Sequence, residues 1–116
     1  MHAINLVEKL ATFDDVYHPR TVAVFNGHDV MVAKCLGDFP WHRHEHTDDL
    51  FLVIKGRLRI EMRDGSVTLG PGELFIVPRG VEHRPVPLEE VHLLLIEPTG
   101  TPNTGDAKSA APRALI

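Results

Sequence analysis

The sequence predicts an all-β protein, an antiparallel β-sandwich or a double-sheet jelly-roll barrel. Short apolar or alternating segments recur at spacings of about ten residues, turn-forming residues separate them, and no long amphipathic helix interrupts the series. The 116 residues provide for one hydrophobic core. We therefore expect a single domain over residues 1–98, followed over 99–116 by a C-terminal tail that is extended or poorly ordered.

The first third of the chain contains one ambiguous segment and one hairpin. Residues 4–13 fit helical spacing and strand alternation about equally well, so the pattern decides for neither. Residues 21–25 and 30–36 have the apolar content of strands. Between them stands Asn26-Gly27, a dipeptide typical of tight hairpin turns. We expect these two strands to pair.

The middle of the chain has the clearest alternation. After an apolar run over residues 50–54, apolar and charged residues alternate strictly from 57 to 62. This is the pattern of an antiparallel strand with one buried face. Turns rich in glycine and proline then separate the remaining short apolar runs. These runs predict strands over residues 67–69, 74–77, 83–86 and 91–96.

Composition argues against several classes of partner and location. The net charge of −4 and the dispersed lysines and arginines give no basic surface for nucleic acid. No apolar run is long enough to cross a bilayer, and no secretory leader is recognisable. Cys35 is the only cysteine, and such a lone thiol is more often a small core residue than a nucleophile. We therefore expect a cytoplasmic protein with neither a nucleic-acid nor a membrane partner.

Residues 37–56 contain the strongest functional signal. His42 and His44 are two positions apart, and on a strand such side chains share one face about 7 Å apart. Asp49 opens the apolar strand that follows. Imidazole nitrogen and carboxylate oxygen are suitable ligands for zinc, ferrous iron, manganese or nickel. The stretch therefore predicts part of a metal site, which needs a further ligand from elsewhere in the chain.

Two motifs make the chain resemble the cupin superfamily. The first joins a glycine, a His-x-His pair, a carboxylate and a second glycine, here Gly37, His42, His44, Asp49 and Gly56. The second has a glycine, a proline, a glycine and a histidine at fixed spacing, here Gly72, Pro78, Gly80 and His83. Pro87 stands where many members have asparagine. The motifs occupy residues 37–56 and 72–87, and the chain is similar in particular to the small single-domain group described as mannose-6-phosphate-isomerase-like.

The resemblance implies a barrel that binds one divalent transition-metal ion per chain, with Fe, Mn, Zn and Ni all left open. It places His42, His44 and His83 at three histidine ligand positions, and Asp49 where the family usually has glutamate. Aspartate is one methylene shorter, which sets its oxygen back by about 1.5 Å. Asp49 therefore either binds the ion directly, acts through a water molecule, or leaves a three-histidine site.

The resemblance also implies a homodimer. Leu50, Leu52 and Ile54 alternate with Phe51 and Val53, which are expected to face the barrel interior. The three outward side chains would need cover, and a second copy of the chain would supply it.

Other polar residues near the motifs are expected to have structural roles. We expect His46 to lie exposed in the loop between ligand strands, Asp48 to be solvated or to cap a strand, and Arg43 to face away from the metal. His92 is expected to be a structural histidine, with the barrel interior as the alternative. Three carboxylates are expected on the surface, although each is also a possible partner for the outer nitrogen of a ligand imidazole: Glu45, Glu73 and Glu82.

Two functions follow from an open metal site. Three nitrogens and at most one oxygen leave positions of an octahedral ion free for water or substrate. The first function is a metalloenzyme that acts on a small polar metabolite by dioxygenase or isomerase chemistry. The alternative is a non-catalytic module that binds a small acid or sugar through the metal. An acid or base facing the open positions would favour the enzyme, and His92 is the one candidate that the sequence offers.

Overall fold

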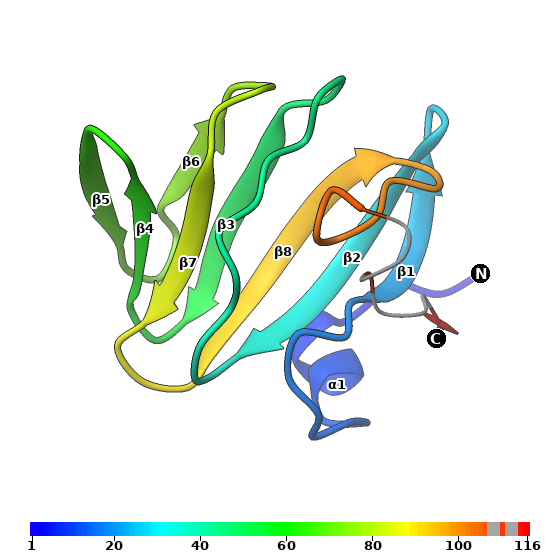
Figure 1. The fold of residues 1–116 in the computed structure, drawn as a ribbon. Coiled ribbons are helices and arrows are strands. Elements are labelled where there is room, and N and C mark those ends of the chain that lie inside the picture. The colour runs from blue at the N-terminus through cyan, green and yellow to red at the C-terminus, as the bar shows by residue number, and fades with distance from the viewer. Residues whose placement is uncertain (107–109, 111–113) are drawn as a thin grey trace.

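Two β-sheets face each other in the computed structural model, which describes residues 1–106, 110 and 114–116 (Figure 1). The larger sheet has the strand order β6-β3-β8-β2-β1-β9, and the smaller has the order β5-β4-β7. The predicted all-β jelly-roll fold is confirmed. The elements are α1 (Leu6–Leu10), β1 (Arg20–Phe25), β2 (His28–Cys35), β3 (Asp49–Lys55), β4 (Leu58–Met62), β5 (Gly65–Leu69), β6 (Leu74–Val77), β7 (His83–Pro87), β8 (Val91–Pro98) and β9 (Ala114–Leu115).

Apart from the strand expected at His42 and His44, the strands predicted over residues 21–96 are present, and the ambiguous N-terminal segment contains a helix. Asn5 begins α1 by accepting a hydrogen bond from the backbone N–H of Glu8 at 3.0 Å. The predicted hairpin joins β1 to β2, with Asn26 and Gly27 at φ values of 50° and 73°. Two successive positive φ angles are what a tight hairpin turn requires, and asparagine and glycine adopt them most readily.

The main core lies between the two sheets. In β4 the predicted alternation is confirmed, since Leu58 and Ile60 are completely buried while Arg59 and Glu61 are only half-buried. Burying a side chain of this size stabilises the fold by roughly 1.5–3 kcal/mol. The inward residues of β2, β3 and β8 meet this strand from the larger sheet: Met31, Ala33, Cys35, Phe51, Val53, Val91, Leu93 and Leu95.

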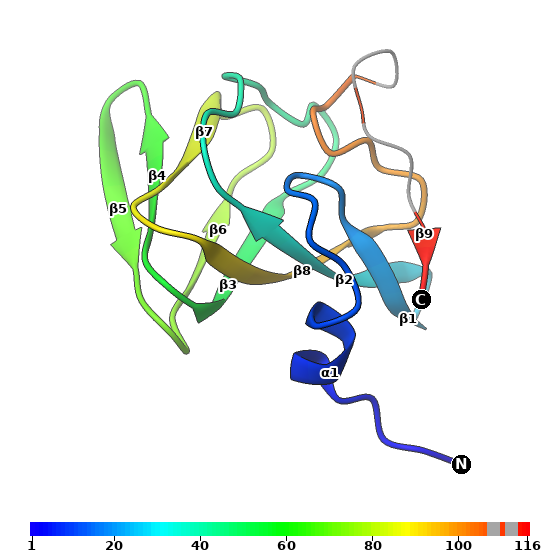
Figure 2. The same cartoon turned by 90° about the horizontal axis from the view of Figure 1, so that it is seen from below.

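A second, smaller cluster covers part of the outer face of the large sheet. Leu10 of α1 and Phe13 after it pack against Val22 and Val32, and Figure 2 shows the helix outside the sheet, beside β1 and β2. The Nζ of Lys34 lies 5.0 Å from the centre of the Phe13 ring and donates to the Phe13 carbonyl.

The remaining outer face, on the β3 and β6 side, has less cover. Leu50 and Leu52 are half-buried, as the alternation predicts, and Leu74 and Ile76 beside them are exposed. This surface suits a second copy of the chain, but the homodimer stays a prediction.

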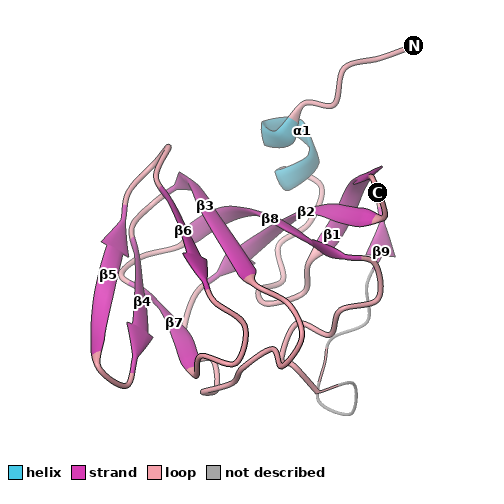
Figure 3. Ribbon diagram, turned by 90° about the horizontal axis from the view of Figure 1, so that it is seen from above, coloured by secondary structure: helices cyan, strands magenta, loops and turns pink. Residues whose placement is uncertain are grey.

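Part of the C-terminal tail can be described. Ala114 and Leu115 pair in parallel with Arg20 and Thr21 at the edge of the large sheet (Figure 3). The expectation of an extended or poorly ordered tail also concerns residues 107–109 and 111–113, which lie outside the described residues. Within the described ranges, no helix has the length and apolar character of a membrane span. The cytoplasmic location stays a prediction from composition.

Candidate metal centre

Two of the four predicted ligands are held by regular strands. Asp49 is the first residue of β3 and shares its inward face with Phe51 and Val53. Val77 of β6 pairs with Asp49 across the ladder. His83 is the first residue of β7 and pairs with Met62 of β4. Only 4% of the surface of Asp49 and 1% of that of His83 are exposed, so both residues lie in the interior.

The other two ligands lie in a loop, which corrects the expectation that His42 and His44 share the face of a strand. His42 forms only an isolated bridge, in which its N–H and carbonyl each bond to the backbone of His83 at 2.9 Å. The carbonyl of His44 accepts from the N–H of Gly80 at 2.8 Å. The second motif therefore positions the first through the backbone, and no regular strand is needed to direct both rings inward.

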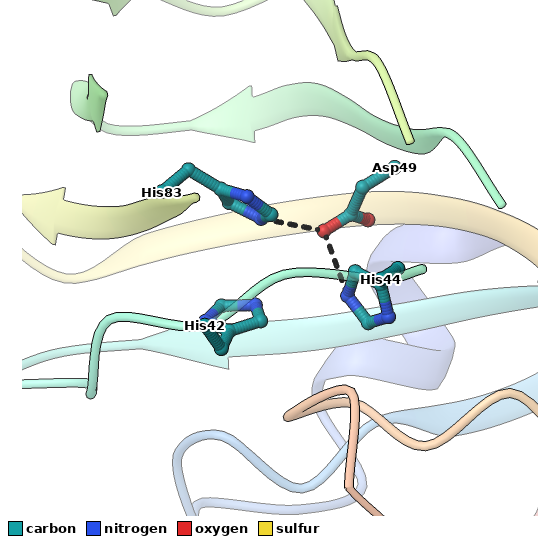
Figure 4. A group of neighbouring side chains, drawn as sticks. All are labelled: His42, His44, Asp49 and His83. Carbon is teal, nitrogen blue, oxygen red and sulfur yellow. Dashed lines mark hydrogen bonds and ion pairs between the residues drawn. The ribbon is translucent and has the colours of Figure 1, made fainter. Parts of the chain in front are cut away.

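The four side chains converge on one point between the sheets (Figure 4). One ligand atom from each of His42, His44, Asp49 and His83 can be chosen so that all lie within 4.8 Å of one another. Asp49 Oδ2 is 3.0 Å from His83 Nε2 and 3.3 Å from His44 Nε2. Metal–ligand bonds of 2.0–2.2 Å place neighbouring donors about 3 Å apart, so these spacings fit one ion. The shorter aspartate does reach the histidines.

Backbone carbonyls fix the orientation of two imidazoles. His42 Nδ1 is 2.9 Å from the carbonyl of Pro40, and His83 Nδ1 is 2.9 Å from the carbonyl of Val81. A carbonyl can only accept, so each Nδ1 carries a proton, and when such a ring is neutral its lone pair is on Nε2, which faces the interior. This is the tautomer that a metal ligand needs.

When the imidazoles are neutral, acceptor atoms of the site face one another. His83 Nε2 faces the carboxylate of Asp49, and two acceptors at that distance repel unless a cation lies between them. His44 Nε2 is buried and has no hydrogen-bond partner of good geometry, although Asp49 is close. A buried polar atom without a partner costs about 1–3 kcal/mol. A divalent cation or a proton would satisfy both groups, so the donor set fits a metal ion.

The charge states agree with ligand chemistry. Burial lowers the pKa of His42 to about 4, so this ring is neutral at pH 7. Burial by itself would raise the pKa of Asp49, but close contacts with the imidazoles of His44 and His83 and with Glu97 hold it below its usual range. The ionised carboxylate is the only formal negative charge that these four residues bring to the site.

Glu97 is a residue of the site that sequence reasoning missed. It is 4% exposed, lies on the inward face of β8 after Val91, Leu93 and Leu95, and interacts with Asp49. Its position at the end of that apolar stripe was the available signal, since every second residue of a strand shares one face. The alternation had instead drawn attention to His92.

His92 is on the opposite face of β8 and does not reach the metal centre. Its Nε2 is 2.8 Å from the Glu90 carboxylate, so it is the structural histidine that the sequence favoured. His46 is exposed, and Asp48 accepts from the backbone N–H of Arg79 at 3.0 Å. The three carboxylates considered as partners for ligand imidazoles instead bond elsewhere: Glu45 to Arg43, Glu73 to the Gly70 N–H, and Glu82 to Arg63.

A pocket of about 50 Å³ adjoins two of the four donors. Its wall includes His42 and Asp49, so a molecule in the pocket would contact the same groups that could hold an ion. Cys35 also lines it, 3% exposed, and burial raises the pKa of this thiol to about 12. At neutral pH the thiol is therefore protonated and forms an apolar part of the wall.

Comparisons with known proteins agree with this architecture. Residues 30–97 match the family model described as Cupin domain. A crystal structure of a cupin-2 domain protein from Shewanella frigidimarina is 40% identical with a TM-score of 0.80, over 82% of this chain and 93% of that one. A protein from Neisseria meningitidis is 32% identical with a TM-score of 0.75, over 84% and 100% of the two chains.

One curated relative is also similar. The Bacillus subtilis protein YdbB, described as uncharacterised, is 32% identical over 65 residues. The match covers 55% of this chain and 58% of the relative, so it spans less than two thirds of that protein's length.

Proposed function

This chain belongs to the cupin domain family, and we propose that it is a metal-dependent enzyme that acts on a small molecule at the barrel centre. The observation that carries the proposal is the convergence of His42, His44, Asp49 and His83, with histidine lone pairs directed at a carboxylate. The narrower placement in the mannose-6-phosphate-isomerase-like group is part of the same proposal and rests on the two sequence motifs.

Each of the four residues would contribute one ligand to a divalent transition-metal ion. The histidines would offer Nε2 atoms, which lie beside Asp49 in His44 and His83, and Asp49 would offer Oδ2 and one negative charge. Such a set selects among zinc, iron, manganese and nickel only weakly. The bound ion would supply Lewis acidity or, as ferrous iron, dioxygen activation, and dioxygenase-type or isomerase-type chemistry would follow.

The position of Glu97 favours an enzyme over a binding module. A carboxyl group that is buried beside Asp49 in the wall of the pocket can hold or pass a proton to a bound molecule. A module that only binds a small acid or sugar through the metal has no need of such a group. This module is the alternative, and it would bind its ligand without converting it.

Elemental analysis of the purified protein tests the metal centre. We expect about one transition-metal ion per chain, and little in the double variant His44→Ala, His83→Ala. His46→Ala is the matched control, because it removes an exposed histidine from the same loop and should leave the metal content unchanged. Full metal content in the double variant would overturn the proposal, and equal losses in the double variant and the control would show that the change is not specific to the site.

A further inference from the structure

The pocket beside the candidate metal centre has a largely apolar wall. Pro19, Phe39 and Pro85 contribute to it. Its interior surface comes from the inward faces of β2, β3 and β8, through Met31, Ala33, Cys35, Phe51, Leu93 and Leu95. Each of these six is at most 8% exposed. A molecule that enters therefore meets packed carbon and a neutral thiol on most sides.

The polar side chains in the wall bond to the protein. The Tyr17 hydroxyl donates to the Gly37 carbonyl, and the Asn103 amide donates to the Tyr17 carbonyl at 3.1 Å. Glu97 interacts with Asp49. The polar contacts offered to a ligand are therefore concentrated at one end of the pocket, where His42, Asp49 and Glu97 lie.

From this distribution we infer that the ligand carries its oxygen donors at one end and a small hydrocarbon body at the other. The inference rests on the proposed metal function, because the donor end would bind the ion. A sugar fits poorly, since hydroxyls along its whole length would be buried against carbon without partners. A volume of about 50 Å³ has room for only about three or four water-sized groups, which limits the body to a short chain.

Two probes of equal size test this ligand class. 2-Hydroxybutanoate and glycerate share the same chelating 2-hydroxycarboxylate head, and they differ only in a terminal methyl against a terminal hydroxyl. Isothermal titration calorimetry on protein loaded with zinc should show that 2-hydroxybutanoate binds about 10- to 100-fold more tightly, the usual range for such an exchange in an apolar pocket. Equal or tighter binding of glycerate, or no binding of 2-hydroxybutanoate, would overturn the inference.

A matched pair of variants places the hydrocarbon body in the pocket. Ala33→Ser adds a hydroxyl to the wall and should reduce the preference for 2-hydroxybutanoate at least threefold, whereas Ala23→Ser, outside the pocket, should leave it unchanged. A full preference in Ala33→Ser would locate the ligand elsewhere and contradict the inference. The zinc content of the same wild-type sample separates the two proposals. Failure to hold zinc overturns both, while retained zinc with a preference for glycerate overturns the ligand class alone.

Discussion

The two halves of the candidate metal centre are built differently. Asp49 and His83 begin strands, so backbone ladders with β6, β8 and β4 hold them. His42 and His44 lie in a loop, and three backbone hydrogen bonds join these two residues to His83 and Gly80. The strand-held half owes its geometry to the sheets, whereas the loop-held half obtains it from the second motif. The two sequence motifs therefore form one structural unit.

The largest expected effect comes from removing the charge of the strand-held half. If Asp49 is a direct ligand, Asp49→Asn removes the negative charge contributed by the four donors and should weaken metal affinity at least 10-fold, the lower limit for losing outer-shell support. Asp49→Glu should retain the metal, although an extra methylene in a packed barrel costs about 1–3 kcal/mol of stability. Competitive metal titration measures both.

The alternative three-histidine site predicts a different result. There Asp49 would only hold the imidazoles in place, and Asp49→Asn would leave the affinity nearly unchanged. If the metal affinity of Asp49→Asn stays within about threefold of wild type, Asp49 is not a ligand, because loss of a ligand should weaken the affinity at least 10-fold.

Two glycines distinguish the halves by their effects on stability and affinity. Gly56 has φ of 83°, and a Cβ there would be 2.5 Å from the Glu90 carbonyl oxygen. Gly80 has φ of 78° with open space around it, and its N–H supports His44. We expect Gly56→Ala to lower the free energy of unfolding by roughly 2–4 kcal/mol and Gly80→Ala by about 1–2 kcal/mol.

Metal affinity should follow the opposite order. Gly56 is at the far end of β3 from Asp49, so its replacement should leave the affinity of the folded protein unchanged. Gly80→Ala should lower it by about 10-fold, because the support of His44 is disturbed. Denaturant unfolding and metal titration together measure the pair, and an affinity loss confined to Gly56→Ala would contradict the division into two halves.

At neutral pH the smallest effect concerns the pocket wall that both halves share. Burial raises the pKa of Cys35 from 9.0 to about 12, so above pH 9 the unfolded state loses this proton while the folded state keeps it. The stability that Cys35 contributes is thus complete below pH 9 and is lost as the pH rises toward 12, by up to about 1.4 kcal/mol for each pH unit.

Cys35→Ala isolates this contribution from other alkaline titrations. Unfolding free energies measured from pH 8 to 11 should decline more steeply in the wild type than in the variant. Parallel declines would show that the thiol ionises as easily in the folded protein as in the unfolded chain, and the pocket wall would then be wetter than its lining suggests.

The sequence was sufficient to predict most of the fold and the four converging side chains. Alternation located strands such as β4, and two spaced motifs pointed to His42 and His83 across a gap of forty residues. The loop conformation of His42 and His44 was not predictable, because the sequence pattern His-x-His is the same in a strand and in a loop that forms a single β-bridge. The domain boundary at residue 98 stays a prediction.

The residues that line the pocket could not be predicted from the sequence, for a different reason. Its wall combines Tyr17, Cys35, Phe51 and Glu97, which come from four segments that only the sheet order brings together. Alternation in β8 does place Glu97 on the buried face, but an acidic residue near a strand end usually marks the surface. The side chain of Glu97 could be placed only with the register of the sheet, in which Asp29 of β2 pairs with Glu97 of β8.

Trp41 directly precedes His42, and the guanidinium of Arg63 lies 3.7 Å from the centre of its indole ring. It is the only tryptophan in the chain. Its fluorescence therefore originates one residue from the metal centre, in an environment set by a neighbouring cation. Paramagnetic ions such as nickel quench nearby indole emission whereas zinc does not, so the protein carries an intrinsic optical reporter that can follow metal entry without any added label.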